Sequence, residues 1–196
     1  LSGKGLAIFA GLVMIYISVF GQWKPSMQTL SFILVAAPLS FAFGLSLGIW
    51  AYKNKRVEKA LYPILLTMQT MPQYAVLVPA MVLFGIGDHA AVIITMVVAI
   101  PPMILLTLLG RRAVPPEVSE AGKMSGCNNW QLMFKVLIPT ARRDILIGVN
   151  QVIMVCFAMA VIAAFIGAKG LGWNLLVALN QLNIGLALEA GLCISL

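Results

Sequence analysis

Long stretches without a charged residue constrain this chain more than any other feature of its sequence. Asp, Glu, Lys and Arg are absent from 5–23, 25–52, 60–87, 89–110 and 145–168. About 20 consecutive apolar residues are enough for a helix to cross the hydrocarbon core of a bilayer. Charged residues make up 10% of the chain, against roughly 25% in a soluble domain. We therefore predict an all-α integral membrane protein.

The same windows predict a polytopic bundle of about six transmembrane helices. We expect helices over about 5–22, 27–52, 60–86, 90–110 and 145–167, and a sixth that starts near Gly185. The segment 168–184 is then an external connection. The chain starts without Met and stops within an apolar run. We interpret it as a single domain, 1–196, excerpted from a longer protein with its last helix truncated.

The basic residues predict which side of the membrane each loop occupies. All but Lys24 and Lys169 of the 13 Lys and Arg residues precede residue 5 or lie within 53–59 and 111–143. Under the positive-inside rule these three regions are cytoplasmic. We therefore expect the N-terminus of this segment and the loop 111–144 on the cytoplasmic side. The net charge of +7 is then an orientation signal, and no aromatic-interleaved basic patch favours nucleic acid.

A row of small residues predicts one close helix contact. Ser40, Gly44 and Gly48 recur at four-residue spacing. In lipid, small residues at this period let two helix backbones approach each other closely. The partner helix belongs either to the same subunit or to another one.

Few polar side chains interrupt the apolar windows. An intramembrane polar group usually faces the protein interior or a water-filled path. Interhelical hydrogen bonds are the alternative, and for a carboxylate in the first turns of a helix, a contact with the helix dipole. The candidate translocation residues are Gln69, Thr70, Asn150, Gln151 and Glu189.

The predicted cytoplasmic loop begins with the pattern of a short helix. Pro115 and Pro116 start it, and Glu117 and Glu120 suit its N-terminal turn. Gly126 ends it in a left-handed cap. The loop therefore contains an ordered element that ends at a glycine.

A second helix follows in the same loop. Asn128 caps it, with Gln131 three residues later as the return partner. Its apolar residues form one predicted stripe at helical spacing, and Pro139 breaks the pattern. The stripe lies either on the bilayer surface or on the cytoplasmic ends of other helices. Its members are Trp130, Met133, Phe134 and Leu137.

The loop resembles the EAA loop of ABC importer permeases. That pattern is Glu-Ala-Ala, three residues, Gly, nine residues, Ile, any residue and Leu-Pro. Here it is Glu120-Ala121-Gly122, three residues, Gly126, nine residues and Val136-Leu137-Ile138-Pro139. Gly122, Val136 and Ile138 depart from it by small or apolar exchanges. The resemblance implies a coupling helix that docks on an ATPase subunit, with coupling residues Glu120, Ala121, Gly122, Ser125, Gly126 and Pro139.

Four further motifs resemble the permeases for glycine betaine, proline and choline. They are Met68–Pro72, Leu83–Gly87, Gly148–Gln151 and Ile162–Gly172. Leu66 stands where this group often carries Asp. The resemblance covers about residues 27–196 and implies a type I ABC importer-like fold. It also implies osmoprotective or amino-acid transport, with a quaternary ammonium or methylamine solute as the cargo.

The resemblance implies partners as well. We expect two permease subunits forming a homodimer, ABC ATPase subunits and an extracytoplasmic substrate-binding protein, assembled in a bacterial inner membrane. No G-x-x-x-x-G-K-[ST] phosphate loop occurs, so we expect no cofactor on this chain and ATP with Mg at the ATPase. Cys127, Cys156 and Cys193 match no metal-ligand spacing, and we expect no metal site.

Other functions remain as alternatives. The main one is an importer permease for another small solute, such as a sulfonate or nitrate compound. A passive channel requires a pore-lining ring or filter sequence, and none is visible. A membrane enzyme requires a nucleophile–base pair, a metal cluster or paired acids within a span. His89 is the only histidine and lies in an expected external turn, so we expect no enzymatic activity.

Overall fold

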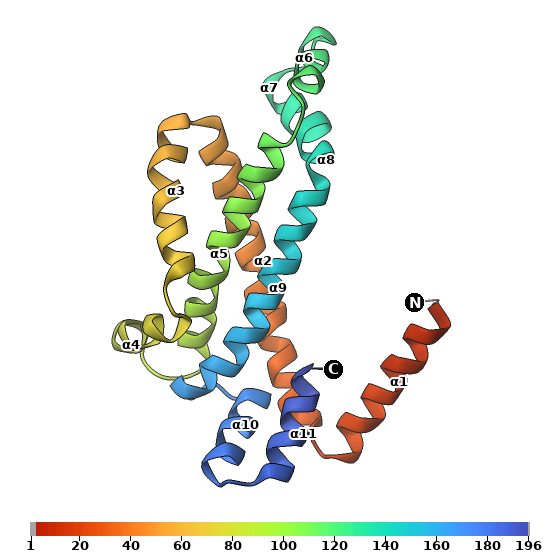
Figure 1. The fold of residues 1–196 in the computed structure, drawn as a ribbon, viewed down its shortest axis with the longest axis vertical. Coiled ribbons are helices and arrows are strands. Elements are labelled where there is room, and N and C mark those ends of the chain that lie inside the picture. Colours follow the sequence, from red (N-terminus) through yellow and green to blue (C-terminus); the bar gives the residue numbers. More distant parts are fainter. Residues whose placement is uncertain (1–2, 196) are drawn as a thin grey trace. The chain divides into compact units, whose positions relative to one another are not determined.

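The computed structural model describes residues 3–195, including every side chain in that range except that of Arg111. No strand occurs among these residues, and almost all of them are helical (Figure 1). A π-helix, Leu132–Leu137, and a 3-10 helix, Ala163–Ile166, interrupt the α-helical order. The α-helices are α1 (Gly3–Val19), α2 (Trp23–Lys53), α3 (Lys55–Thr70), α4 (Gln73–Phe84), α5 (Asp88–Arg112), α6 (Pro116–Met124), α7 (Asn129–Gln131), α8 (Ile138–Thr140), α9 (Arg142–Ile162), α10 (Leu171–Asn180) and α11 (Ile184–Ser195).

Within residues 3–195, three helical stretches are long and apolar enough to cross a membrane. They are Trp23–Lys53, Asp88–Gly110 and Arg142–Ile166, and they confirm the expected helices over 27–52, 90–110 and 145–167. Four further apolar helices are shorter, namely α1, α4, α10 and α11. Among the described residues, the expected bundle of about six helices is thus three long spans and several shorter apolar helices.

The single helix expected over 60–86 is wrong. α3 ends at Thr70 and α4 begins at Gln73. Met71 is extended, with φ −70° and ψ 135°, because the ring of Pro72 disfavours helical backbone in the residue before it. Pro72 also brings no N–H to continue the helical hydrogen bonds.

The segment 168–184 is more than the plain connection that the sequence pattern suggested. It contains α10. The polar residues at its start reduced the apolar signal, although a helix of this length needs only one buried face. Leu171, Gly172 and Ala178 are its buried residues.

The chain divides into two compact units. The first unit comprises Leu1–Ala36, Gln73–Thr95 and Cys156–Leu196, and the second comprises Ala37–Pro72 and Met96–Val155. In the first unit, Ile17 of α1 packs with Leu171 of α10 and Cys193 of α11.

Glycines let the helices of the second unit approach closely. A Cβ on Gly44 would lie 2.6 Å from Cβ of Met103, and one on Gly48 would lie 2.7 Å from Cβ of Thr107. The close contact predicted for the small residues of α2 is therefore confirmed, and its partner is α5 of the same chain. On α9, a Cβ on Gly148 would lie 2.9 Å from Sδ of Met103. Glycines thus admit α5 closely against both α2 and α9.

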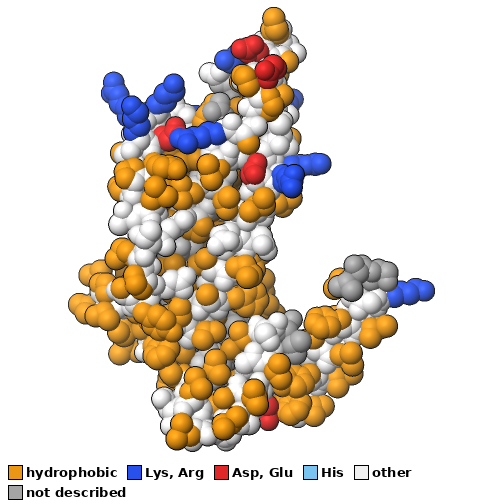
Figure 2. Space-filling model, in the orientation of Figure 1, with side chains coloured by type: hydrophobic (Ala, Val, Ile, Leu, Met, Phe, Trp, Pro, Cys, Tyr) orange, Lys and Arg blue, Asp and Glu red, His pale blue; other side chains and the backbone are white. Residues whose placement is uncertain are grey.

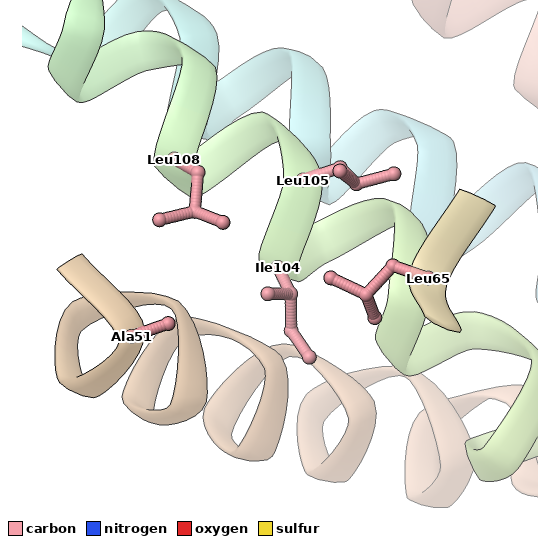
Figure 3. Packing of buried hydrophobic residues seen from close by; sticks show 5 residues of the cluster. All are labelled: Ala51, Leu65, Ile104, Leu105 and Leu108. Carbon is pink, nitrogen blue, oxygen red and sulfur yellow. The ribbon is translucent and has the colours of Figure 1, made fainter. Parts of the chain in front are cut away.

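Apolar side chains from three helices fill the centre of the second unit. Ala51 of α2 and Leu65 of α3 meet residues of α5 (Figure 3). Each of these side chains is less than one-tenth exposed. Burial of this kind keeps α3 against α5. It does not by itself fix the orientation of α3, because apolar contact is non-directional. The α5 residues are Ile104, Leu105 and Leu108.

Candidate functional site

Helix α6 forms where the predicted coupling loop begins. Pro115 is extended at φ −57° and ψ 139°, and Pro116 occupies the first turn. Proline suits this position because its fixed φ matches a helix and the first N–H groups have no helical partner. Glu117 lies in the first turn and Lys123 in the last. Both charges complement the helix dipole.

A glycine ends α6 as the sequence predicts. The Gly126 N–H donates to the Lys123 carbonyl at 3.0 Å, and the Cys127 N–H donates to the Gly122 carbonyl at 3.2 Å. This pair of bonds is a Schellman motif. Gly126 has φ +76°, a left-handed conformation that side chains with a Cβ rarely adopt. The left-handed cap at Gly126 is therefore confirmed.

The second helix of the loop begins at the predicted cap and continues further than expected. Asn128 precedes α7, and its N–H donates to Oε1 of Gln131 at 2.9 Å. The expected break at Pro139 is wrong, because the chain stays helical through Thr140. The π-helix accommodates Pro139, since the Ile138 N–H bonds to the carbonyl of Met133 five residues earlier. Such a widened turn tolerates a residue without an N–H.

The predicted single apolar stripe divides into two faces. Met133 and Leu137 are buried, whereas Trp130 is 62% and Phe134 is 51% exposed. The π-helix changes the angular spacing, so a 3.6-residue period no longer places these four side chains together. Trp130 and Phe134 stack on each other with their ring centroids 5.5 Å apart. Nζ of Lys53 lies 4.2 Å from the Trp130 ring centroid, within range of a cation–π contact.

The buried face of the loop packs on the end of α2. Leu132, Met133 and Leu137 form a cluster against which Ile49 and Tyr52 of α2 pack. The sequence left two positions for the stripe, the bilayer surface or the ends of other helices. Its buried members, Met133 and Leu137, pack against the end of α2. Burial of these side chains fixes the loop to the rest of the second unit, so the loop is an ordered element.

Gly122 lies at the interface between α6 and the following helix. A Cβ there would be 2.6 Å from Cδ1 of Leu132 and 3.5 Å from Cγ2 of Val136. Gly122 is buried, so its place in the motif serves close packing of the two loop helices. The opposite surface of α6 is open.

The open surface of α6 contains most of the remaining predicted coupling residues. Glu120, Ala121, Ser125 and Gly126 are exposed. Met124 is 90% exposed. Charged side chains gather at the end of the second unit that carries α6 and the start of α3 (Figure 2). α6 is therefore a short helix with two different faces. Its rear face packs on the next loop helix, and its exposed front face is mostly polar and includes one methionine.

The candidate translocation residues lie on the surface of this chain. Gln69 and Thr70 are exposed at the end of α3, and Asn150 and Gln151 are exposed on α9. Glu189 is half-buried on α11, in the first unit. Among the described residues, no hydrogen bond joins the side chain of Gln69, Asn150 or Gln151 to another residue. Within the part of the chain that the structure describes, these three side chains therefore do not form the interhelical hydrogen bonds of the alternative interpretation.

Sequence reasoning missed a set of polar contacts in the first unit. The Lys169 N–H donates to Oδ1 of Asp88 at 2.9 Å. Nδ2 of Asn174 donates to Oε1 of Gln22 at 2.9 Å. Gln22 is 4% exposed, and its pairing satisfies a buried amide. The first contact joins the segment before α10 to the start of α5. The second joins α10 to the residue before α2. Only the Ile162–Gly172 motif marked this region in the sequence.

The family follows from a match to residues 40–196. This part of the chain matches the binding-protein-dependent transport system inner membrane component family. The chain belongs to this family. The resemblance identified from the EAA-like loop is thereby confirmed.

Several permeases are similar to this chain along its length. It is 88% identical over all 196 residues to the trimethylamine N-oxide transport system permease protein TmoV of Pelagibacter ubique, of which it covers 27%. It is 50% identical over its full length to TmoV of Ruegeria pomeroyi, of which it covers 30%. It is 40% identical over 194 residues, 99% of the chain, to the glycine betaine transport system permease protein OpuAB of Bacillus subtilis, of which it covers 69%. The chain thus spans less than a third of either TmoV protein.

Solved structures support the fold. A chain of the MetNI methionine ABC transporter, crystallised in inward-facing conformations, matches with a TM-score of 0.78 at 21% identity, over 93% of this chain and 89% of that one. A chain of an amino acid ABC transporter crystallised with histidines matches with a TM-score of 0.68 at 17% identity, over 100% of this chain and 89% of that one. The expected all-α, type I ABC importer-like fold is therefore confirmed.

Proposed function

We propose that this chain is part of the permease subunit of an ATP-driven importer for small methylated amines. The family and the names of its relatives support this function. The proposed solute class is trimethylamine N-oxide, glycine betaine and related quaternary ammonium or methylamine compounds. The 88% identity to a trimethylamine N-oxide permease favours the N-oxide within that class. Glycine betaine is the second candidate, because OpuAB is 40% identical.

The observation that best supports the mechanism is α6. A helix with one face packed on the following π-helix at Gly122 and the other face exposed suits docking on a separate subunit. We propose that Glu120, Ala121, Ser125 and Gly126 contact the ATPase subunit. Gly122 and Pro139 then shape the loop that presents these residues. ATP and Mg belong to the ATPase in this proposal, and no cofactor is assigned to this chain.

The orientation follows from the charges. We infer that the N-terminus of this segment and the loop 111–144 are cytoplasmic, because basic residues near spans favour that side. Residues 1–196 then form one permease transmembrane domain with 111–144 as its coupling loop. A substrate-binding protein would deliver solute from the opposite side.

A second permease subunit is part of the proposal. α1 is mostly apolar apart from Lys4 and Ser18, yet Ile17 is its one buried residue among the part of α1 that the structure describes. Lipid and a partner helix are the environments that accept such a surface. The residues proposed for the translocation path are Gln69, Thr70, Asn150, Gln151 and Glu189, because a polar or charged side chain costs less beside water than in lipid. We propose a homodimer, with these residues facing the shared path.

Uptake into proteoliposomes tests the function. The full-length protein, its ATPase and its binding protein are reconstituted, and accumulation of labelled trimethylamine N-oxide, glycine betaine and a sulfonate is measured with and without ATP. ATP-dependent accumulation of a methylated amine supports the proposal. Accumulation of the sulfonate alone would overturn the solute class. Movement down a gradient without ATP would favour a passive channel.

A further inference from the structure

Arg112, the last residue of α5, connects that helix to α3. Its Nη2 donates to Oε1 of Glu58, in the first turn of α3, and forms an ion pair with it. Its guanidinium carbon lies 5.6 Å from the centroid of the Tyr62 ring, one turn further along α3. Among the described side chains this is the only ion pair. Arg112 therefore holds α3 by an ion pair and an aromatic contact at neighbouring turns.

Arg112 also borders the coupling loop. It lines a cleft of about 290 Å³ whose wall includes Ser119, Glu120 and Lys123 of α6. Ala113, Val114 and Pro115 are the whole connection between α5 and α6. This connection is stiff, because proline fixes φ and Val114 packs against the buried loop cluster. The end of α5, where Arg112 lies, is therefore held close to the start of α6.

The ion pair gives α3 a directional connection that its apolar contacts lack. The side chain of Glu58 is 18% exposed and that of Arg112 is 55% exposed. A hydrogen bond prefers a direction as well as a distance, and the contact between Nη2 and Oε1 is one. The other end of α3 carries Gln69 and Thr70, just before the break at Pro72. α3 therefore carries the ion-paired Glu58 in its first turn and two candidate translocation residues in its last turn.

We propose that Arg112 is a positioning residue that transmits movement of α6 to α3 through Glu58 and Tyr62. The inference rests on the proposed function and adds a mechanical route to it. When the ATPase moves α6, the end of α5 moves with it, and the ion pair turns or shifts α3. Without the pair, α6 still docks, but α3 follows less closely. ATP is then hydrolysed with less solute moved.

Charge exchange separates this role from a general structural one. Uptake and ATP hydrolysis are measured in the same proteoliposomes for the wild type, Arg112→Glu, Glu58→Arg and the double variant. We expect each single variant to import about three- to fivefold less solute per ATP hydrolysed, and the double variant to recover most of that loss. Lys59→Glu is the matched control, because Lys59 is an exposed basic residue of α3 next to Glu58 and outside the coupling loop, and its reversal should leave the ratio unchanged.

Three outcomes would overturn the inference. The ratio could stay at its wild-type value in both single variants, or the double variant could recover nothing. Either single variant could also lose co-purification with the ATPase, which would show that the pair builds the loop and does not transmit movement. A wild-type complex that hydrolyses ATP without importing a methylated amine would instead contradict the proposed function. The wild-type measurement therefore separates the two failures.

Discussion

The N–H of Leu171 donates a 2.9 Å hydrogen bond to the hydroxyl oxygen of Thr29, which lies 142 residues earlier in the chain. Leu171 is the first residue of α10, where a helix has no partner of its own for this donor. Gly170 makes the approach possible, because a Cβ there would lie 2.6 Å from Oγ1 of Thr29. A side chain of α2 thus caps α10.

Replacing Thr29 by Val should destabilise the first unit. Val fills a similar volume but leaves the buried Leu171 N–H without an acceptor, which costs about 1–3 kcal/mol. The expected result is a lower melting midpoint of the detergent-purified protein. Thr29→Ser is the matched control, because it keeps the hydroxyl. Equal midpoints for the Val and Ser variants would show that the hydrogen bond contributes nothing.

Replacing Gly48 by Ala should separate α2 from α5. The new methyl group would lie 2.7 Å from Cβ of Thr107, an atom held by the α5 backbone. Overpacking of this kind costs about 1–3 kcal/mol, so we expect a lower melting midpoint. In α1, Gly11 has nothing within 4 Å of the added methyl. Gly11→Ala should therefore leave the midpoint unchanged or raise it, and an equal loss in both variants would contradict the packing argument.

Much of the fold could be predicted because lipid imposes simple rules. Charge-free windows locate the long helices, since a charged residue in the hydrocarbon core is costly. The break before α4 depends on Pro72, which the pattern contained but which membrane helices often tolerate. α10 was missed because Lys169 and Asn174 reduce the apolar signal of the segment. The Gln22–Asn174 pair joins positions 152 residues apart, and a single sequence gives no sign of such pairing.

The coupling loop was predictable where local rules act and unpredictable where packing decides. The caps at Gly126 and Asn128 follow from side-chain and backbone chemistry within a few residues. The separation of Trp130 and Phe134 from Met133 depends on the π-helix. A stripe counted at 3.6 residues per turn assumes a regular α-helix, and π-helical turns are rare. Which members of the stripe are buried depends on contacts with Ile49 and Tyr52 of α2, which are distant in the sequence.

Replacing Gly126 by Val should reduce transport more than assembly. A left-handed conformation costs a residue with a Cβ about 1–2 kcal/mol, and a β-branched residue is worse. The end of α6 would then shift, so ATP-dependent uptake should fall while membrane insertion persists. Gly126→Asn is the control, because Asn tolerates this conformation and should retain most of the uptake. Normal uptake together with normal ATPase pull-down in the Val variant would refute the prediction.

Met124 supplies the last prediction, because it is 90% exposed at the end of α6. If α6 docks on the ATPase, this side chain becomes buried at the interface, where an apolar anchor can contribute about 1–3 kcal/mol to binding. Met124→Asp should then weaken co-purification of the ATPase about tenfold or more. Met124→Leu keeps the apolar surface and should bind nearly as the wild type does. Unchanged melting of both variants would show that the loss arises at the interface. Equal ATPase binding by both variants would mean that Met124 lies outside the contact, and that α6 docks through its polar residues alone.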